Sequence, residues 1–143
     1  MATVAQILAS KPDRAVHTIA PTATVFEAVQ RMAEKNVGAL VVVESGKVVG
    51  VVTERDYARK VALLARSSKD TPVRDVMTAD VMYVLPERTS EECMALMTEN
   101  RFRHLPVLDQ GRLVGLVSIG DLVKDVISEQ KFTIEQLEHY IAG

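Results

Sequence analysis

Two copies of one short pattern, a hydroxyl residue followed three positions later by aspartate, carry the most informative chemistry of this sequence. They are Thr53-Glu54-Arg55-Asp56 and Ser118-Ile119-Gly120-Asp121. One interpretation is a helix cap, because a hydroxyl and a carboxylate at a helix start accept hydrogen bonds from exposed N–H groups and favour the positive end of the helix dipole. The other is a ligand site, in which the carboxylate binds a vicinal diol such as that of ribose and the helix start faces a phosphate. Both interpretations stay open, since duplication copies a cap as faithfully as a site.

Both patterns belong to an internal repeat that covers most of the chain. The phrase "GKVVGVVTERD" begins at residue 46 and "GRLVGLVSIGD" at residue 111, an offset of 65 positions. Near the amino end the offset becomes 69, pairing Val4 with Val73, so the first copy is four residues longer. A repeat of this length has to be recognised before domains are counted.

The length and composition limit what these repeats can form. The 143 residues are 48 % hydrophobic and 25 % charged, with a formal net charge of −2. Copies of about 60 residues are each marginal for burying a core, so we expect them to pack on each other as one compact module. The predicted boundaries are 1–68 for the first repeat, 69–130 for the second and 131–143 for a carboxyl-terminal helix.

Several classes of function find no support in the sequence. A single cysteine, Cys93, leaves no disulfide framework or zinc spacing and favours a reducing, cytoplasmic setting. There is no export signal and no apolar run of the roughly 20 residues that span a bilayer. Phosphate-loop, GxGxxG, GxSxG and HExxH motifs are absent, which argues against an enzyme and against a metal site. Scattered basic residues and 4 % aromatics argue against nucleic-acid binding.

Each copy has the pattern of a short strand, a helix, a strand, a tight turn, a strand and a helix. Thr24 with Glu27, and Thr89 with Glu92, have capping-box spacing before an apolar helical face. Two β-rich runs around a glycine-containing turn predict an antiparallel hairpin in each copy, with strands covered on both faces. Helices are expected at 57–66 and 122–129, and a further amphipathic helix is expected in the tail from Phe132.

In its order of elements, and in the G-h-V-[S/T]-x-x-D phrase that closes each hairpin, the chain resembles the cystathionine-β-synthase (CBS) domain family. The stretches "NVGALVVVESGKVVGVVTERD" and "RFRHLPVLDQGRLVGLVSIGD" carry the likeness, which extends from about Val4 to about Ile127. The resemblance implies an α/β (α+β) fold of tandem repeats, each a small sheet packed with two helices, related by a pseudo-twofold axis. It also implies a regulatory Bateman module that binds AMP, ADP, ATP, NAD or S-adenosylmethionine in clefts between its halves.

The same resemblance implies two sets of ligand-contacting residues. One site would place Ser118, Gly120 and Asp121 near the ribose. Around its base would lie residues of the first copy: His17, Thr18, Val37, Gly38 and Ala39. The pseudo-symmetric site would use Thr53, Arg55 and Asp56 with residues of the second copy: Val81, Met82, Tyr83, Phe102, Arg103, His104 and Pro106.

The two copies differ in charge where the second begins its hairpin. Asn36, Gly38 and Ala39 of the first copy correspond to Arg101, Arg103 and His104 of the second. We interpret Arg101 as a cation at a helix end, whereas in similar proteins the other two positions face the ligand phosphate, a role that suits the forked donors of arginine. Two unequal sites are therefore expected.

Some residues keep two interpretations. Gly38 could permit close approach of a ligand base or simply form the turn before the strand. Arg55 is interpreted as a phosphate contact, and Arg59 and Lys60 as an exposed basic face. Arg14, in the extra four residues, could reach an extended ligand.

The leading functional hypothesis is a regulatory module that senses an adenine nucleotide without catalysing a reaction. A sensor of this kind needs a ligand that binds two states of the protein with different affinity. The alternative is an interaction subunit with vestigial nucleotide clefts that regulates an enzyme or transporter. The expected assembly is a homodimer through the helices at 57–66 and 122–129 and the tail.

Overall fold

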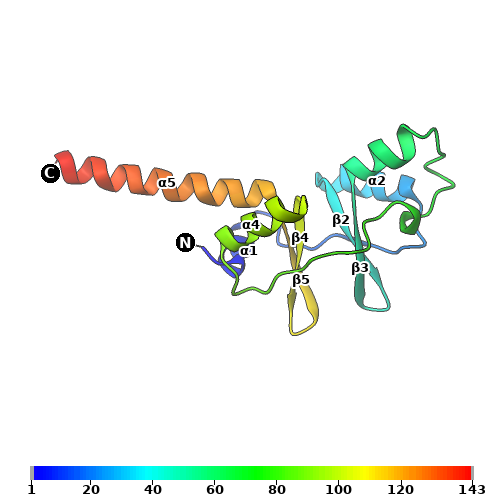
Figure 1. Ribbon diagram of the computed structural model, residues 1–143, viewed down its shortest axis with the longest axis horizontal. Helices are drawn as coiled ribbons and strands as arrows, with labels where there is room; N and C mark the ends of the chain where they lie inside the picture. Colours follow the sequence, from blue (N-terminus) through cyan, green and yellow to red (C-terminus); the bar gives the residue numbers. More distant parts are fainter. Residues whose placement is uncertain (1, 143) are drawn as a thin grey trace. The chain divides into compact units, whose positions relative to one another are not determined.

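The computed structural model describes residues 2–142, which divide into two compact units (Figure 1). The first-copy unit comprises Ala15–Met82 and Gly111–Val114. Of the described residues, the second-copy unit comprises 2–14, Tyr83–Gln110 and 115–142. The unit borders therefore differ from the predicted boundaries at residues 68 and 69, because each copy is completed by a segment that precedes the other copy in sequence.

The first-copy unit is built on a three-stranded sheet in the order β1-β2-β3. Strand β1 runs parallel to β2, and β2 forms an antiparallel hairpin with β3, interrupted by a register shift between Val42 and Val43. The hairpin turns through Ser45 and Gly46, both with positive φ, as a two-residue turn of the primed type requires. Its elements are β1 Thr18–Ile19, α2 Val25–Lys35, β2 Ala39–Glu44, β3 Lys47–Thr53, α3 Glu54–Tyr57, the π-helix η1 Ala58–Ala62 and the 3₁₀-helix η2 Val73–Asp75.

Apolar side chains from every element of this unit except α3 form one core. The four successive residues Ala39–Val42 are buried, which confirms the prediction that this strand is covered on both faces. The core cluster comprises Ile19, Val25, Ala28, Met32, Leu40, Val42, Val52, Val61, Val73 and Val76.

The second-copy unit repeats this plan with fewer paired strands. Strands β4 (His104–Asp109) and β5 (Arg112–Ser118) form a two-stranded sheet. The counterpart of β1 is reduced to one parallel bridge between Val84 and Val107. Its helices are α1 Val4–Ser10, α4 Ser90–Asn100 and α5 Ile119–Ala142.

The amino-terminal segments of the two copies are exchanged. Helix α1 packs with the second copy: Val4 N donates to Arg88 O, and Leu8 lies so close to β5 that a Cβ on Gly115 would be 2.6 Å from its δ carbons. The segment after η2 packs in the same way on the first copy. There a Cβ on Gly50 would be 2.8 Å from the Thr78 carbonyl oxygen. The repeated glycine therefore exists because a neighbouring segment approaches the strand closely.

Three sequence predictions need correction. The helix expected at 57–66 starts earlier, at Glu54, and passes into a π-helix that ends at Ala62. The helix expected at 122–129 and the separate tail helix are one continuous 24-residue helix, α5, since no glycine or proline interrupts residues 121–142. The capping box at Thr89 and Glu92 is complete, but at α2 only the Thr24 side chain accepts, from the Glu27 N–H.

Candidate functional site

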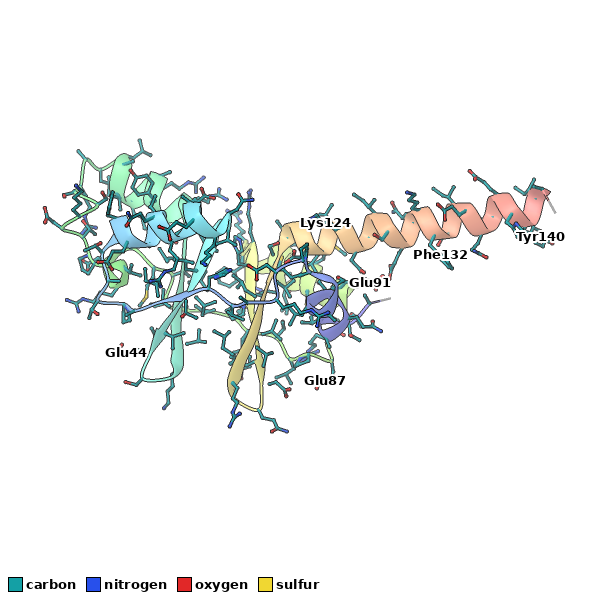
Figure 2. The ribbon with its side chains drawn as sticks, turned by 180° about the vertical axis from the view of Figure 1, so that it is seen from behind. Glu44, Glu87, Glu91, Lys124, Phe132 and Tyr140 are labelled. Atoms are coloured by element: carbon teal, nitrogen blue, oxygen red, sulfur yellow. The ribbon has the colours of Figure 1, made fainter. Side chains whose placement is uncertain are left out.

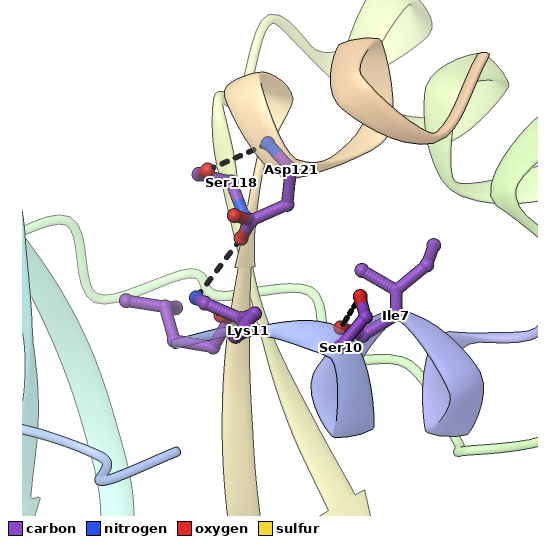
Figure 3. Close-up of polar contacts among 6 residues, drawn as sticks. Ile7, Ser10, Lys11, Ser118 and Asp121 are labelled. Atoms are coloured by element: carbon purple, nitrogen blue, oxygen red, sulfur yellow. Dashed lines mark hydrogen bonds and ion pairs between the residues drawn. The ribbon is translucent and has the colours of Figure 1, made fainter. Parts of the chain in front are cut away.

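The second-copy motif is a helix cap to which a distant lysine is added. The Asp121 N–H donates to Ser118 Oγ (3.1 Å), and the Ser118 N–H donates to Asp121 Oδ2 (2.9 Å). Lys11, just after α1, places its Nζ 3.0 Å from the same Oδ2 and 3.0 Å from the Leu116 carbonyl oxygen (Figure 3). The Asp121 side chain is only 16 % exposed, so this ion pair is partly withdrawn from water.

The first-copy motif forms the same cap but takes its lysine from its own helix. The Asp56 N–H donates to Thr53 Oγ1 (3.1 Å), and Asp56 Oδ2 accepts from the Thr53 N–H (2.9 Å). Lys60, one turn onward, lies 3.1 Å from Asp56 Oδ1 and donates to the Val76 carbonyl oxygen. Thus the bonds to Asp121 converge on one carboxylate oxygen, whereas the bonds to Asp56 use both.

In each unit a backbone hydrogen bond ties the motif to the start of its own hairpin. The Glu54 N–H donates to the Gly38 carbonyl oxygen (3.1 Å), and the Ile119 N–H donates to the Arg103 carbonyl oxygen (2.8 Å). A Cβ on Gly38 would lie 3.0 Å from Glu54 Oε1, so this carboxylate fills the space that the glycine leaves. The first-copy motif therefore has an acidic neighbour where the second has Arg103.

The neighbourhood of Asp121 is basic and partly dehydrated. Burial lowers the pKa of His104 below its ordinary value of 6.5, the positive charges of Lys11 and Arg103 lower it further, and Asp121 opposes them. A His104 imidazole with a lowered pKa is neutral at physiological pH, so it presents one N–H donor and one acceptor. Arg103 is exposed and Lys11 is about one-third exposed on its side chain.

The predicted site residues fall into two groups by unit. His17 lies just before β1 and Thr18 begins it. Val37 and Gly38 lead into β2, which Ala39 begins, and these five residues belong to the same unit as the Thr53–Asp56 motif. Pro106 is buried in β4, and Tyr83 is exposed. The residues of the first-copy unit are His17, Thr18, Val37, Gly38, Ala39, Thr53, Arg55, Asp56, Val81 and Met82, and those of the second-copy unit are Tyr83, Phe102, Arg103, His104, Pro106, Ser118, Gly120 and Asp121. The expected grouping of one copy's acid with the other copy's base contacts remains a prediction.

Lys11 is the residue that sequence reasoning missed. It is separated from Asp121 by 110 positions and has no lysine counterpart in the other copy, because an offset of 69 places Asp80 there. Lys60 was interpreted as part of an exposed basic face, yet it pairs with Asp56. Its i,i+4 spacing from that acid is a sequence signal that could have found it.

The described residues offer little for other chemistry. Among residues 2–142 no group of three or more histidine, cysteine or acidic side chains is arranged to hold a metal ion. Cys93 is buried in α4, and burial raises the pKa of its thiol. Within the same residues no helix has both the length and the apolar character needed to cross a bilayer.

Known proteins share this arrangement over most of the chain. The CBS domain profile matches residues 4–63 and 73–128. A mitochondrial CBS domain-containing protein of Arabidopsis thaliana, CBSX3, is 46 % identical over 125 residues, which are 84 % of this chain and 61 % of that protein. The chain thus spans about three fifths of this relative.

Solved structures agree with that match. A protein with CBS domains from Burkholderia ambifaria MC40-6, classed with signal-transduction proteins, is 59 % identical, with a TM-score of 0.86 over 90 % of this chain and 96 % of that one. The CBS domain pair of protein MJ0100, solved with 5′-methylthioadenosine and S-adenosyl-L-methionine, is 26 % identical, with a TM-score of 0.76 over 90 % of this chain and 98 % of that one. With two matched copies in one chain, this protein is a CBS pair and belongs to the CBS domain family.

Proposed function

We propose that this CBS pair is a non-catalytic regulatory module that binds an adenosine-containing ligand, and that Asp121 holds the ligand ribose. The observation that carries the proposal is the geometry of Asp121: Ser118 and Lys11 both bond to Oδ2. A ribose diol would therefore bind at Oδ1, without displacing the lysine. The MJ0100 pair, with its bound adenosyl compounds, supports this class of ligand.

The basic residues around Asp121 favour a phosphorylated ligand. Arg103 and Lys11 supply positive charge beside the neutral His104, and charge-assisted hydrogen bonds to phosphate are about twice as strong as neutral ones. AMP, ADP, ATP and NAD fit this chemistry better than an uncharged nucleoside. Binding of phosphate would also stabilise protonated His104, so we expect proton uptake on binding near neutral pH.

The two motifs are expected to bind unequally. Asp56 already uses both carboxylate oxygens, one of them for Lys60, and Glu54 adds negative charge beside Gly38. A phosphorylated ligand at the first-copy motif would have to displace Lys60 from the acid and tolerate the Glu54 carboxylate. The second-copy motif is therefore the higher-affinity site.

The test uses calorimetry on the wild type, D121N and the matched variant D56N. The compounds titrated are AMP, ADP, ATP, NAD, S-adenosylmethionine and adenosine. Hydrogen bonds to charged groups contribute about 1.5–3 kcal/mol, so D121N should weaken the tighter site about 10- to 100-fold, with a smaller effect for D56N. Far-UV circular dichroism checks folding. The proposal would be refuted if none of the six compounds bound to the wild type. It would also be refuted if folded D121N bound them as tightly as the wild type does.

A second measurement separates phosphate recognition from ribose recognition. R103Q should weaken AMP binding about tenfold and leave adenosine binding nearly unchanged, because it removes a cation that only the phosphate requires. Mass spectrometry of small molecules released from the gently denatured protein identifies the natural ligand. Should no adenosine compound be released or bound, the alternative of an interaction subunit with vestigial sites gains support.

A further inference from the structure

The carboxyl end of α1 is bonded to its unit by a side chain where the first copy uses main chain. In the first copy, Val51 and Thr78 exchange two main-chain hydrogen bonds of 3.0 and 2.9 Å. The offset of 65 positions places Leu116 where Val51 lies, and its carbonyl oxygen accepts instead from Lys11 Nζ at 3.0 Å. Within residues 2–142 no main-chain bridge joins Leu116 to α1. The polar attachment of this end to β5 therefore depends on one ammonium group.

The two ends of α1 differ in how firmly they are fixed. Val4 is fully buried at the amino end, and its N–H donates at 2.8 Å to the main chain just before α4. At the carboxyl end the Ala9 carbonyl oxygen accepts locally, from the Arg14 guanidinium at 2.7 Å. Release of Lys11 would therefore break no main-chain hydrogen bond to β5. The end of α1 can open in this way while its start stays fixed.

The Lys11 ammonium retains a donor for a ligand. It carries three N–H groups, and its acceptors among the described residues are the Leu116 carbonyl oxygen and, as Figure 3 shows, Asp121 Oδ2. The Lys11 side chain is 29 % exposed, so the third N–H is open to a molecule bound at Asp121. After burial, the charges of Lys11 and Arg103 lower the pKa of His104. The ammonium therefore faces the region proposed for the phosphate.

We propose that Lys11 couples ligand binding to the docking of the end of α1, residues 8–11, on β5. This inference rests on the proposed function, because it requires a phosphorylated adenosine compound at Asp121. When the end of α1 is docked, the ammonium donates to the ligand phosphate as well as to its two protein acceptors. When that end is open, the ligand loses this charge-assisted hydrogen bond. The ligand therefore binds the docked state more tightly and shifts the protein toward it.

This coupling gives the module a means of reporting its ligand. Because coupling between two events is reciprocal, anything that keeps the end of α1 docked raises the ligand affinity by the same factor. Adenosine has no phosphate and leaves the third N–H of Lys11 unused, so it should have little effect on α1. In the first copy the main-chain bridge at Thr78 does not involve Lys60, so displacement of that lysine leaves the bridge intact. The response therefore belongs to the second-copy unit alone.

The test measures amide hydrogen exchange of the full chain by NMR, with and without saturating AMP. AMP should slow the exchange of residues 8–11 about tenfold, and adenosine should slow it less than about twofold. The amides of α4 are the reference within the same unit, because general stabilisation of that unit would slow them equally. Calorimetry on the same samples shows whether AMP is bound. If AMP binds and residues 8–11 gain no more protection than α4, the coupling is refuted while the proposed function stands.

Two lysine variants test whether Lys11 is the cause. K11M should bind AMP about tenfold more weakly, and at saturating AMP its residues 8–11 should exchange as fast as without ligand. The matched control is K124M, which removes an exposed lysine of α5, labelled in Figure 2, that has no ion pair among the described residues.

K124M should keep the wild-type response to AMP. Circular dichroism checks that both variants fold, and the comparison of AMP with adenosine in the wild type depends on neither. A folded K11M whose residues 8–11 still become protected by AMP would overturn the role of Lys11. Loss of the response in K124M would overturn it as well, since a general loss of positive charge would then explain the effect.

Discussion

The two copies of the repeat have the same main-chain plan but attach different side chains to it. Both motifs cap a helix start, and in both the residue after the hydroxyl donates its backbone N–H to a carbonyl at the start of its own hairpin. In the first copy the helix that follows changes to a π-helix and ends by Ala62, whereas in the second it continues for 24 residues. Backbone geometry has thus been retained after duplication, while charge and helix length have diverged.

The largest expected difference between the copies concerns the two repeated glycines. G50A would place a Cβ 2.8 Å from a backbone oxygen, which cannot move alone, and overpacking costs typically about 1–3 kcal/mol. G115A meets only the flexible end of Leu8, so its cost should be about 1 kcal/mol. Urea unfolding measures both variants. Equal losses of unfolding free energy in the two variants would contradict the view that the Thr78 backbone, and not local side chains, limits the space at Gly50.

The next difference concerns the lysine that forms an ion pair with each aspartate. K11M should lower the free energy of unfolding by about 1–2 kcal/mol, because it leaves the mostly buried Asp121 without its cation and separates α1 from α5. K60M should cost less than about 0.5 kcal/mol, since Lys60 is 44 % exposed and forms an i,i+4 pair. Denaturant midpoints of the two variants would show the contrast. A larger loss of stability for K60M than for K11M would contradict this prediction.

A smaller effect is expected at the ends of α2 and α4. Asn36 and Arg101 both have positive φ, which costs arginine more than asparagine. R101N relieves the unfavourable φ but removes a favourable cation at the helix end, so its net effect should be a stabilisation of about 0.5 kcal/mol. N36R should destabilise the protein by a similar amount. Thermal unfolding compares them. Destabilisation by R101N would indicate that the Arg101 side chain has a role beyond the cap.

The smallest effect is the pH dependence that His104 introduces in the second copy alone. Because its pKa is lowered in the folded state, the unfolded chain binds the proton first, so stability should fall as pH decreases below about 6.5. Above that pH neither state is protonated and the contribution disappears. H104Q should reduce the slope of unfolding free energy against pH between 7 and 5; an unchanged slope would assign it to other groups.

Much of the architecture was predictable because it depends on local patterns. Hairpins with Gly46 and Gly111 at the turns, and helices starting at Val25 and Ser90, follow from turn chemistry, periodicity and capping. The Lys11–Asp121 pair was not predictable, since it depends on the exchange of amino-terminal segments, which leaves no local signature. The π-helix at Ala58–Ala62 is equally hidden, because packing and not propensity selects it. The continuous α5 could have been predicted from its uninterrupted helix-forming sequence.

The exchanged position of α1 has a consequence for synthesis of the chain. Val4 and Ile7 on α1 are made before β5, against which Leu8 of the same helix lies, and before α5, whose Asp121 pairs with Lys11. During most of translation these two apolar side chains have no native partner, while the first-copy core, complete by Val76, can already assemble. Folding of the second-copy unit must therefore wait until β5 and α5 have been made.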